Sequence, residues 1–202
     1  GGRYMGGENM HIMNYQKMAC LAVLLLSISV PSFADDWMDV TKWFMTNPAF
    51  DNDSQEGWTW ESNATTQAVR VNCVSFYNGN FNMHQQLKGL PKGHYRLSVQ
   101  GFYRSGENAS AYNRFQNGSE KMTASLYAGE AKQALVSIFS VSMNTNAANR
   151  CWTNDNQHYY PNGKEAALAA FEKGLYWNSL ESTGISYPIS EQPHYEGLLS
   201  AP

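Results

Sequence analysis

The sequence has few of the features that identify a nucleic-acid-binding, disulfide-rich or membrane-spanning protein. Its 14 Lys and Arg residues and 17 Asp and Glu residues give a formal net charge of −3, and the basic residues form no run. Such a chain offers no basic surface for nucleic acid, so none is expected as a partner. Three cysteines are too few for a disulfide scaffold. The apolar runs are shorter than the roughly 20 residues of a membrane helix, so we expect no membrane span.

Recognisable catalytic motifs are also missing. The sequence contains no G-x-S-x-G turn, no H-E-x-x-H pair and no Gly-rich phosphate loop. Its acidic residues are spread along the chain, so they indicate no carboxylate pair of the glycosidase kind. Its histidines show no spacing typical of metal ligands. We therefore expect a protein that is not an enzyme.

The N-terminal region is typical of a secretory signal peptide. Lys17 supplies a positive charge, Ala19 to Val30 form an apolar segment, and Ser32 and Ala34 are the small residues before a cleavage site. We expect residues 1–34 to be leader and signal, with cleavage before Asp35 and export to the periplasm or cell surface or into the medium.

Two cysteines, Cys73 and Cys151, remain after the expected cleavage. In an oxidising compartment they could form a disulfide, and the alternative is two buried thiols. Their spacing in the sequence leaves both open.

The remainder is rich in Asn, Gly, Ser and aromatic residues, which is typical of short strands joined by turns. The segment from Phe81 to Arg104 alternates apolar and polar residues on both sides of a Pro/Gly turn at Pro91, so we expect two antiparallel strands there. Further strands are expected at three places, which are Val69–Phe76, Thr123–Tyr127 and Ala134–Phe139.

One short helix is expected among these strands, from about Gly163 to Lys173. Asn162 and Glu165 have the spacing of a capping box, with Asn162 as the N-cap. Gly174 is a plausible residue to end the helix.

The stretch "NPAFDNDSQEGWTW" at residues 47–60 supports several interpretations. Asp51 and Asp53 have the D-x-D spacing of a calcium loop, but the positions that follow do not fit an EF-hand. A calcium ion bound by Asp51 and by distant parts of the fold is one interpretation, and a surface turn is the other. We expect Phe50 and Trp58 to be buried, with the residues from Asp51 to Gln55 forming a surface turn.

Aromatic residues with polar neighbours are typical of glycan-binding surfaces, because sugar rings stack on aromatic faces. Alternation places Trp58 and Trp60 on the same face, where each is either a core residue or a stacking platform. The candidate glycan-binding residues are Trp60, Tyr77, Asn78, Tyr103, Arg104 and Tyr112.

Three segments resemble the galactose-binding-like β-sandwich modules of secreted Bacteroidales proteins. The segments are "DVTKWFMTNPAFDNDSQEGWTW", "FNMHQQLKGLPKGHYRLSVQGFYR" and "YYPNGKEAALAAFEKGLYWNSLE". The resemblance implies a mostly β protein, an antiparallel jelly-roll sandwich with one short helix over residues 35–181. It also implies a non-catalytic module that binds glycan, with a structural calcium ion near Asp51 in several related modules.

The resemblance stops after Glu181, because the closing motifs of these modules are missing from residues 182–202. We expect an irregular tail there and no further domain of the kind that often follows such a module. Two other functions stay open: a structural or adhesive cell-surface domain without a glycan site, and a fragment of a glycan-active hydrolase.

Overall fold

The computed structural model describes residues 8–15, 18–29 and 37–185. Within these ranges the protein is mostly β, with antiparallel sheets and few helices, as the sequence predicted. None of the helices in these ranges combines the length and apolar character that a bilayer span requires.

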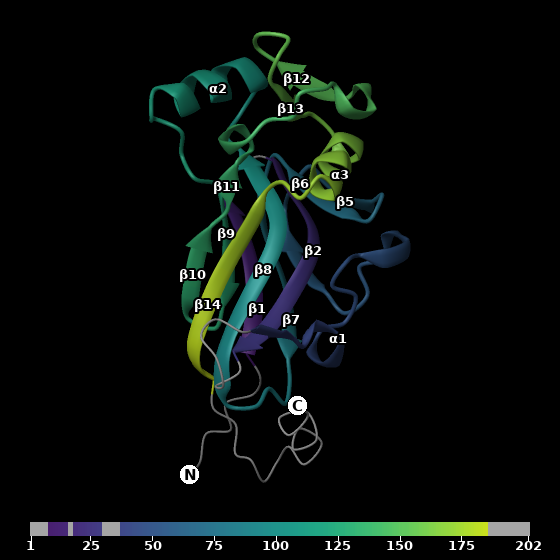
Figure 1. Ribbon diagram of the computed structural model, residues 1–202, viewed down its shortest axis with the longest axis vertical. Coiled ribbons are helices and arrows are strands. Elements are labelled where there is room, and N and C mark those ends of the chain that lie inside the picture. The colour runs from purple at the N-terminus through teal and green to yellow at the C-terminus, as the bar shows by residue number, and fades with distance from the viewer. Residues whose placement is uncertain (1–7, 16–17, 30–36, 186–202) are drawn as a thin grey trace.

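The first sheet has the strand order β10-β9-β1-β7-β4 (Figure 1). Its strands are β10 (Ala131–Ala134), β9 (Ala124–Ala128), β1 (Glu8–Tyr15), β7 (Asn80–Leu87) and β4 (Thr59–Ser62). All of its neighbouring strands are antiparallel.

The second sheet has the order β11-β8-β2-β6-β5, with β14 also beside β8 and β3 beside β2. Its strands are β11 (Val136–Ser137), β8 (Gly93–Arg104), β2 (Met18–Ser29), β6 (Cys73–Tyr77), β5 (Thr66–Arg70), β14 (Trp177–Ile185) and β3 (Trp37–Asp39). The β11–β8 pair is parallel, and the other pairs are antiparallel.

The main core lies between the two sheets. Residues at alternate positions of β7, including Phe81 and Met83, are buried, as the period-2 pattern predicted. Phe81 stacks on Phe76 of β6 in the opposite sheet, with ring centroids 3.9 Å apart. The stack joins the sheets at the centre of the apolar cluster.

The predicted pairing of the two strands around Pro91 is wrong, although both strands exist. β7 pairs with β1 and β4, whereas β8 pairs with β2, β11 and β14, so the turn crosses from one sheet to the other. Leu90 in this turn is buried, and the Tyr95 hydroxyl donates to the Pro91 carbonyl at 2.7 Å. Alternation shows which face of a strand is buried, but it does not identify the neighbouring strand.

Two other predicted strands are interrupted. Val69–Phe76 is a hairpin of β5 and β6, with Arg70 opposite Cys73 and both turn residues, Val71 and Asn72, at positive φ. This turn lacks glycine, and its sequence is nearly as apolar as that of its strands. The sequence pattern therefore gave no sign of a turn. Ala134–Phe139 ends as a strand at Ser137, whose hydroxyl accepts the Phe139 N–H and begins the 3-10 turn Ile138–Ser140.

The expected helix is confirmed as α3 (Lys164–Glu172). Gly174 ends it at φ 77°, and the N–H groups of Gly174 and Leu175 donate to Phe171 and Ala170 in a Schellman arrangement. The predicted N-cap is wrong: Gly163 holds that position, because the Asn162 side chain bonds elsewhere.

Helices that the sequence did not predict are α1 (Thr41–Phe44) and α2 (Asn108–Gln116). The sequence of α2 is rich in Asn and Ser, which are weak helix formers, and it buries only Ala111 fully. Its helical pattern is therefore faint.

The stretch at residues 47–60 is a structural turn. Phe50 and Trp58 are buried with ring centroids 5.4 Å apart, which confirms their prediction, and the turn between them is at the surface. Asn47 organises this turn, since its side chain accepts the Asp51 N–H and donates to the Ser54 carbonyl. The Asn47 carbonyl accepts the Trp58 Nε1–H at 3.0 Å.

The segment expected to be leader and signal contributes β1 and β2 to the two sheets. Export and cleavage stay predictions. At the other end, β14 continues to Ile185, so regular structure extends beyond the predicted boundary at Glu181. The rest of the predicted tail, residues 186–202, lies outside the described residues.

Cys73 and Cys151 are both free thiols in this structure. Burial raises the pKa of the Cys73 thiol to about 12, so this thiol is neutral and unreactive near neutral pH.

Candidate functional site

At one end of the sheets lie α2, β12 and β13 (Figure 1). Aromatic side chains from these elements and from Phe139 form a cluster. β12 (Cys151–Thr153) and β13 (Tyr159–Pro161) form a small antiparallel ribbon with Trp152 opposite Tyr160. Such directly opposed residues project to the same side of a ribbon. The ribbon therefore presents two aromatic rings together.

Phe139 is the buried centre of this cluster. Its ring centroid lies 5.3 Å from that of Tyr112, 5.9 Å from that of Trp152 and 5.1 Å from that of Tyr160. Tyr112 on α2 lies 5.3 Å from Trp152 and 5.9 Å from Tyr160. Edge-to-face and tilted packing of this kind fixes the rings relative to one another.

The cluster is partly open to solvent. Phe139 and Tyr160 are buried, whereas Tyr112 and Trp152 are half-buried. Burial and the nearby Tyr112 raise the pKa of Tyr160. Tyr112 and Trp152 are thus rigidly supported from beneath and accessible from outside.

A polar network accompanies the rings. Arg104, at the end of β8, is buried, and its Nη1 donates to the side-chain carbonyls of Asn108 and Asn162, the latter at 2.9 Å. The Asn108 amide donates to the same Asn162 oxygen at 3.3 Å. Asn108 precedes Tyr112 by one helical turn, so both lie on one face of α2. The network therefore lies beside the aromatic cluster.

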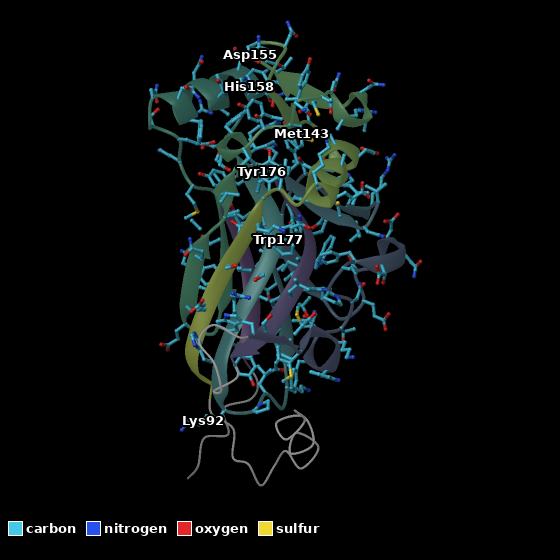
Figure 2. The ribbon with its side chains drawn as sticks, in the orientation of Figure 1. Lys92, Met143, Asp155, His158, Tyr176 and Trp177 are labelled. Atoms are coloured by element: carbon cyan, nitrogen blue, oxygen red, sulfur yellow. The ribbon has the colours of Figure 1, made fainter. Side chains whose placement is uncertain are left out.

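The loop between β12 and β13 carries an acid–histidine pair. Asp155 Oδ2 lies 2.5 Å from His158 Nδ1, and Asp155 Oδ1 accepts the N–H groups of Gln157 and His158. These hydrogen bonds hold the pKa of Asp155 far below its usual range, and the bond from the His158 side chain is the largest cause. Figure 2 shows both residues at the end of the molecule opposite Lys92.

Two of the predicted ligand residues, Arg104 and Tyr112, belong to this site. Tyr103 points the other way: it is buried in the core, and burial, with Glu120 nearby, raises its pKa to about 12. Trp60 also packs on the core, with its ring centroid 5.0 Å from that of Phe76. These two residues therefore support the fold.

Of the last two predicted ligand residues, Tyr77 ends β6 and Asn78 follows it in the turn to β7. Both are exposed, and Asn78 adopts a positive φ of 53°. The aromatic cluster is built from other elements, so these residues do not join the site.

Several site residues were missed by sequence reasoning. Trp152, Tyr160, Asn108 and Phe139 come from four separate segments with no common motif. The ribbon sequence "CWTNDNQHYYP" did contain a signal, because two aromatic groups flank an Asn/Asp-rich turn. Asn162 was identified but was given a helix-capping role.

Asp51, the predicted calcium ligand, is exposed in the 3-10 turn Asp51–Asp53. In the described part of the chain, no three His, Cys, Asp or Glu side chains gather closely enough to hold a metal ion. Calcium binding stays a prediction from the resemblance.

Comparisons with known proteins add no assignment, since no family model, no curated protein and no solved structure matches the chain.

Proposed function

We propose that this protein is a non-catalytic module that binds glycan through the face formed by α2 and the β12–β13 ribbon. The observation that carries the proposal is the pair of half-buried rings, Tyr112 and Trp152, 5.3 Å apart beside the Arg104–Asn108–Asn162 network. Export, as predicted, would bring this face to extracellular glycans.

The aromatic pair suits the apolar face of a sugar ring. Sugar rings carry C–H groups on one face that pack against aromatic rings, and a rigid ring loses little conformational entropy on binding. Phe139 packs beneath both Tyr112 and Trp152, which holds these rings in place before a ligand arrives. This preorganisation favours binding.

The amide and guanidinium groups suit the sugar hydroxyls. A hydroxyl both donates and accepts, and an Asn side chain offers a carbonyl acceptor and two amide donors. Asn162 is exposed and Asn108 is half-buried, so their remaining bonding capacity can face solvent. Arg104 orients both amides from below. The face thus combines a stacking surface with hydrogen-bonding groups.

We further propose that the two sheets form the jelly-roll of the galactose-binding-like modules. Strands distant in sequence are neighbours, such as β7 with β1 and β8 with β14, and the pairs are mainly antiparallel. An experimental structure in which successive strands pair in sequence order would contradict this topology.

The direct test of function is a glycan array probed with the full chain. Gel retardation then follows with the polysaccharides that correspond to the glycans bound on the array. The proposal requires binding that Trp152→Ala weakens and that Tyr77→Ala, at the exposed end of β6, leaves unchanged. Absence of binding to plant, host and microbial glycans would reject it in favour of a structural or adhesive domain. Turnover of a bound glycan would indicate the hydrolase alternative.

A further inference from the structure

Two strands from the N-terminal segment lie inside the sheets and not at their edges. β1 lies between β7 and β9 in the first sheet, and β2 lies between β6 and β8 in the second (Figure 1). Both precede residue 35, the first residue of the chain expected after signal cleavage. Removing them would expose backbone groups on five neighbouring strands at once, which are β3, β6, β7, β8 and β9.

Residues later in the chain bind the backbone of β2 at several separate places. β6 pairs with β2 only as far as Leu21. Groups within residues 40–48 form hydrogen bonds with Leu24 and Leu26 instead. The Leu24 N–H donates to the Pro48 carbonyl at 3.0 Å, and the Leu26 N–H donates to Thr41 Oγ1 at 2.8 Å. The Leu26 carbonyl accepts the Val40 N–H at 2.9 Å.

Two apolar side chains of β2 also fill the core. Leu24 and Leu26 are fully or almost fully buried in the cluster between the sheets. The continuous apolar segment that predicts a signal peptide is equally typical of a strand covered on both faces. Contacts of β2 with α1 and α3 agree with such a covered strand.

We propose that residues 37–185 form an acceptor for two extended polypeptide strands, and that the segment Glu8–Ser29 is its occupant. The segment binds as part of the same chain before cleavage and as a separate peptide after it. Recognition uses the backbone groups of β3, β6, β7, β8 and β9, together with Thr41 and Pro48, and the core positions that Leu24 and Leu26 fill. This is strand addition at the interior of two sheets.

The proposal is tested on the full chain with a site for a specific protease inserted within residues 30–36. The folded protein is cut, unfolded in urea and refolded with an excess of fluorescent peptide that spans Glu8–Ser29. We expect the labelled peptide to be incorporated at least about ten times more than a scrambled peptide of the same composition, a modest preference in free energy.

Two results would overturn the proposal. One is equal incorporation of the ordered and scrambled peptides. The other is a cut protein that loses Glu8–Ser29 and still melts at the temperature of the uncut protein, because the segment would then form no part of the fold.

A cysteine pair tests the position of β2 without an insertion. In a chain with its native cysteines replaced, Leu25→Cys with Ser98→Cys places two thiols at directly opposed positions of β2 and β8. Such pairs lie within the distance range of a disulfide. Ser98→Cys with Ser179→Cys is the positive control, since these hydroxyls lie 3.3 Å apart on β8 and β14.

The matched negative control is Leu25→Cys with Ser179→Cys, because β8 separates these positions by two strand spacings, about 10 Å. We expect a disulfide in the test pair and the positive control alone. A disulfide in the positive control with none in the test pair would show that β2 does not lie beside β8, and the proposal would fail.

Discussion

Tyr112 of α2 and Trp152 of β12 meet with ring centroids 5.3 Å apart and planes inclined by 56°. Neither α2 nor β12 belongs to the two main sheets, yet both rings pack against the same buried Phe139. The sheets thus serve as a base on which α2 and the β12–β13 ribbon place a rigid aromatic pair.

The turn at residues 47–60 should be a major source of stability. Phe50 is fully buried against Trp58, so Phe50→Ala should lower the free energy of unfolding by about 3–5 kcal/mol. Urea denaturation followed by circular dichroism measures this change. Trp43→Ala is the control, because Trp43 is 40% exposed and its loss should change stability little. Equal losses in the two variants would contradict the assignment of Phe50 to the core.

Asn178 joins three strands through its buried side chain. Its amide donates to the carbonyls of Val99 and Gly101 in β8, and its Oδ1 accepts the Val136 N–H of β11 at 2.8 Å. Asn178→Ala leaves these groups unsatisfied, so we expect a loss of about 1–3 kcal/mol.

The control for Asn178 is the adjacent Ser179→Ala, since Ser179 is exposed on the same strand. Thermal melts of the two variants give the comparison. A melting temperature of Asn178→Ala as high as that of Ser179→Ala would show that the Asn178 bonds contribute nothing.

Local sequence patterns predicted the parts of the fold that depend on local physics. The alternation of Phe81, Met83 and Leu87 identified the buried face of β7, and the pattern from Lys164 to Gly174 identified α3. They did not identify strand partners, because pairing depends on residues far away in the chain. The interior position of β2 is the clearest case, since its apolar segment predicts a signal peptide equally well.

The candidate site was only partly predictable for the same reason. Tyr112 and Arg104 were found as an aromatic and a cation near turns, which is a local property. Tyr103, one residue before Arg104, packs in the core instead, because alternate residues of β8 face opposite sides of the sheet. Trp152 becomes a neighbour of Tyr112 only after the β12–β13 ribbon folds over α2.

The loop of the ribbon should respond to acid in a defined direction. The folded-state pKa of Asp155 is lowered, so its stabilising contribution is complete above the ordinary value of 3.8 and is lost as the pH falls through the lower folded value. His158→Gln removes the largest cause of this shift and should move the Asp155 pKa back toward its ordinary value.

Carboxyl carbon chemical shifts in an NMR titration measure the Asp155 pKa directly, both in the unmodified protein and in His158→Gln. The matched control is His84→Gln, because β7 lies in the first sheet, outside the ribbon. An Asp155 titration near 3.8 in the unmodified protein, or one unchanged by His158→Gln, would contradict the hydrogen-bonded loop.

The most direct test of glycan binding compares two tryptophan variants by isothermal titration with the strongest array ligand. Trp152→Ala removes one ring of the pair, whereas Trp177→Ala removes a ring that is 43% exposed on β14 and outside the aromatic cluster. Trp152→Ala should weaken binding by about tenfold or more, since a central aromatic contact commonly contributes over 1 kcal/mol. Trp177→Ala should bind like the unmodified protein. Unchanged affinity in a folded Trp152→Ala protein would contradict the assignment of the site to this face.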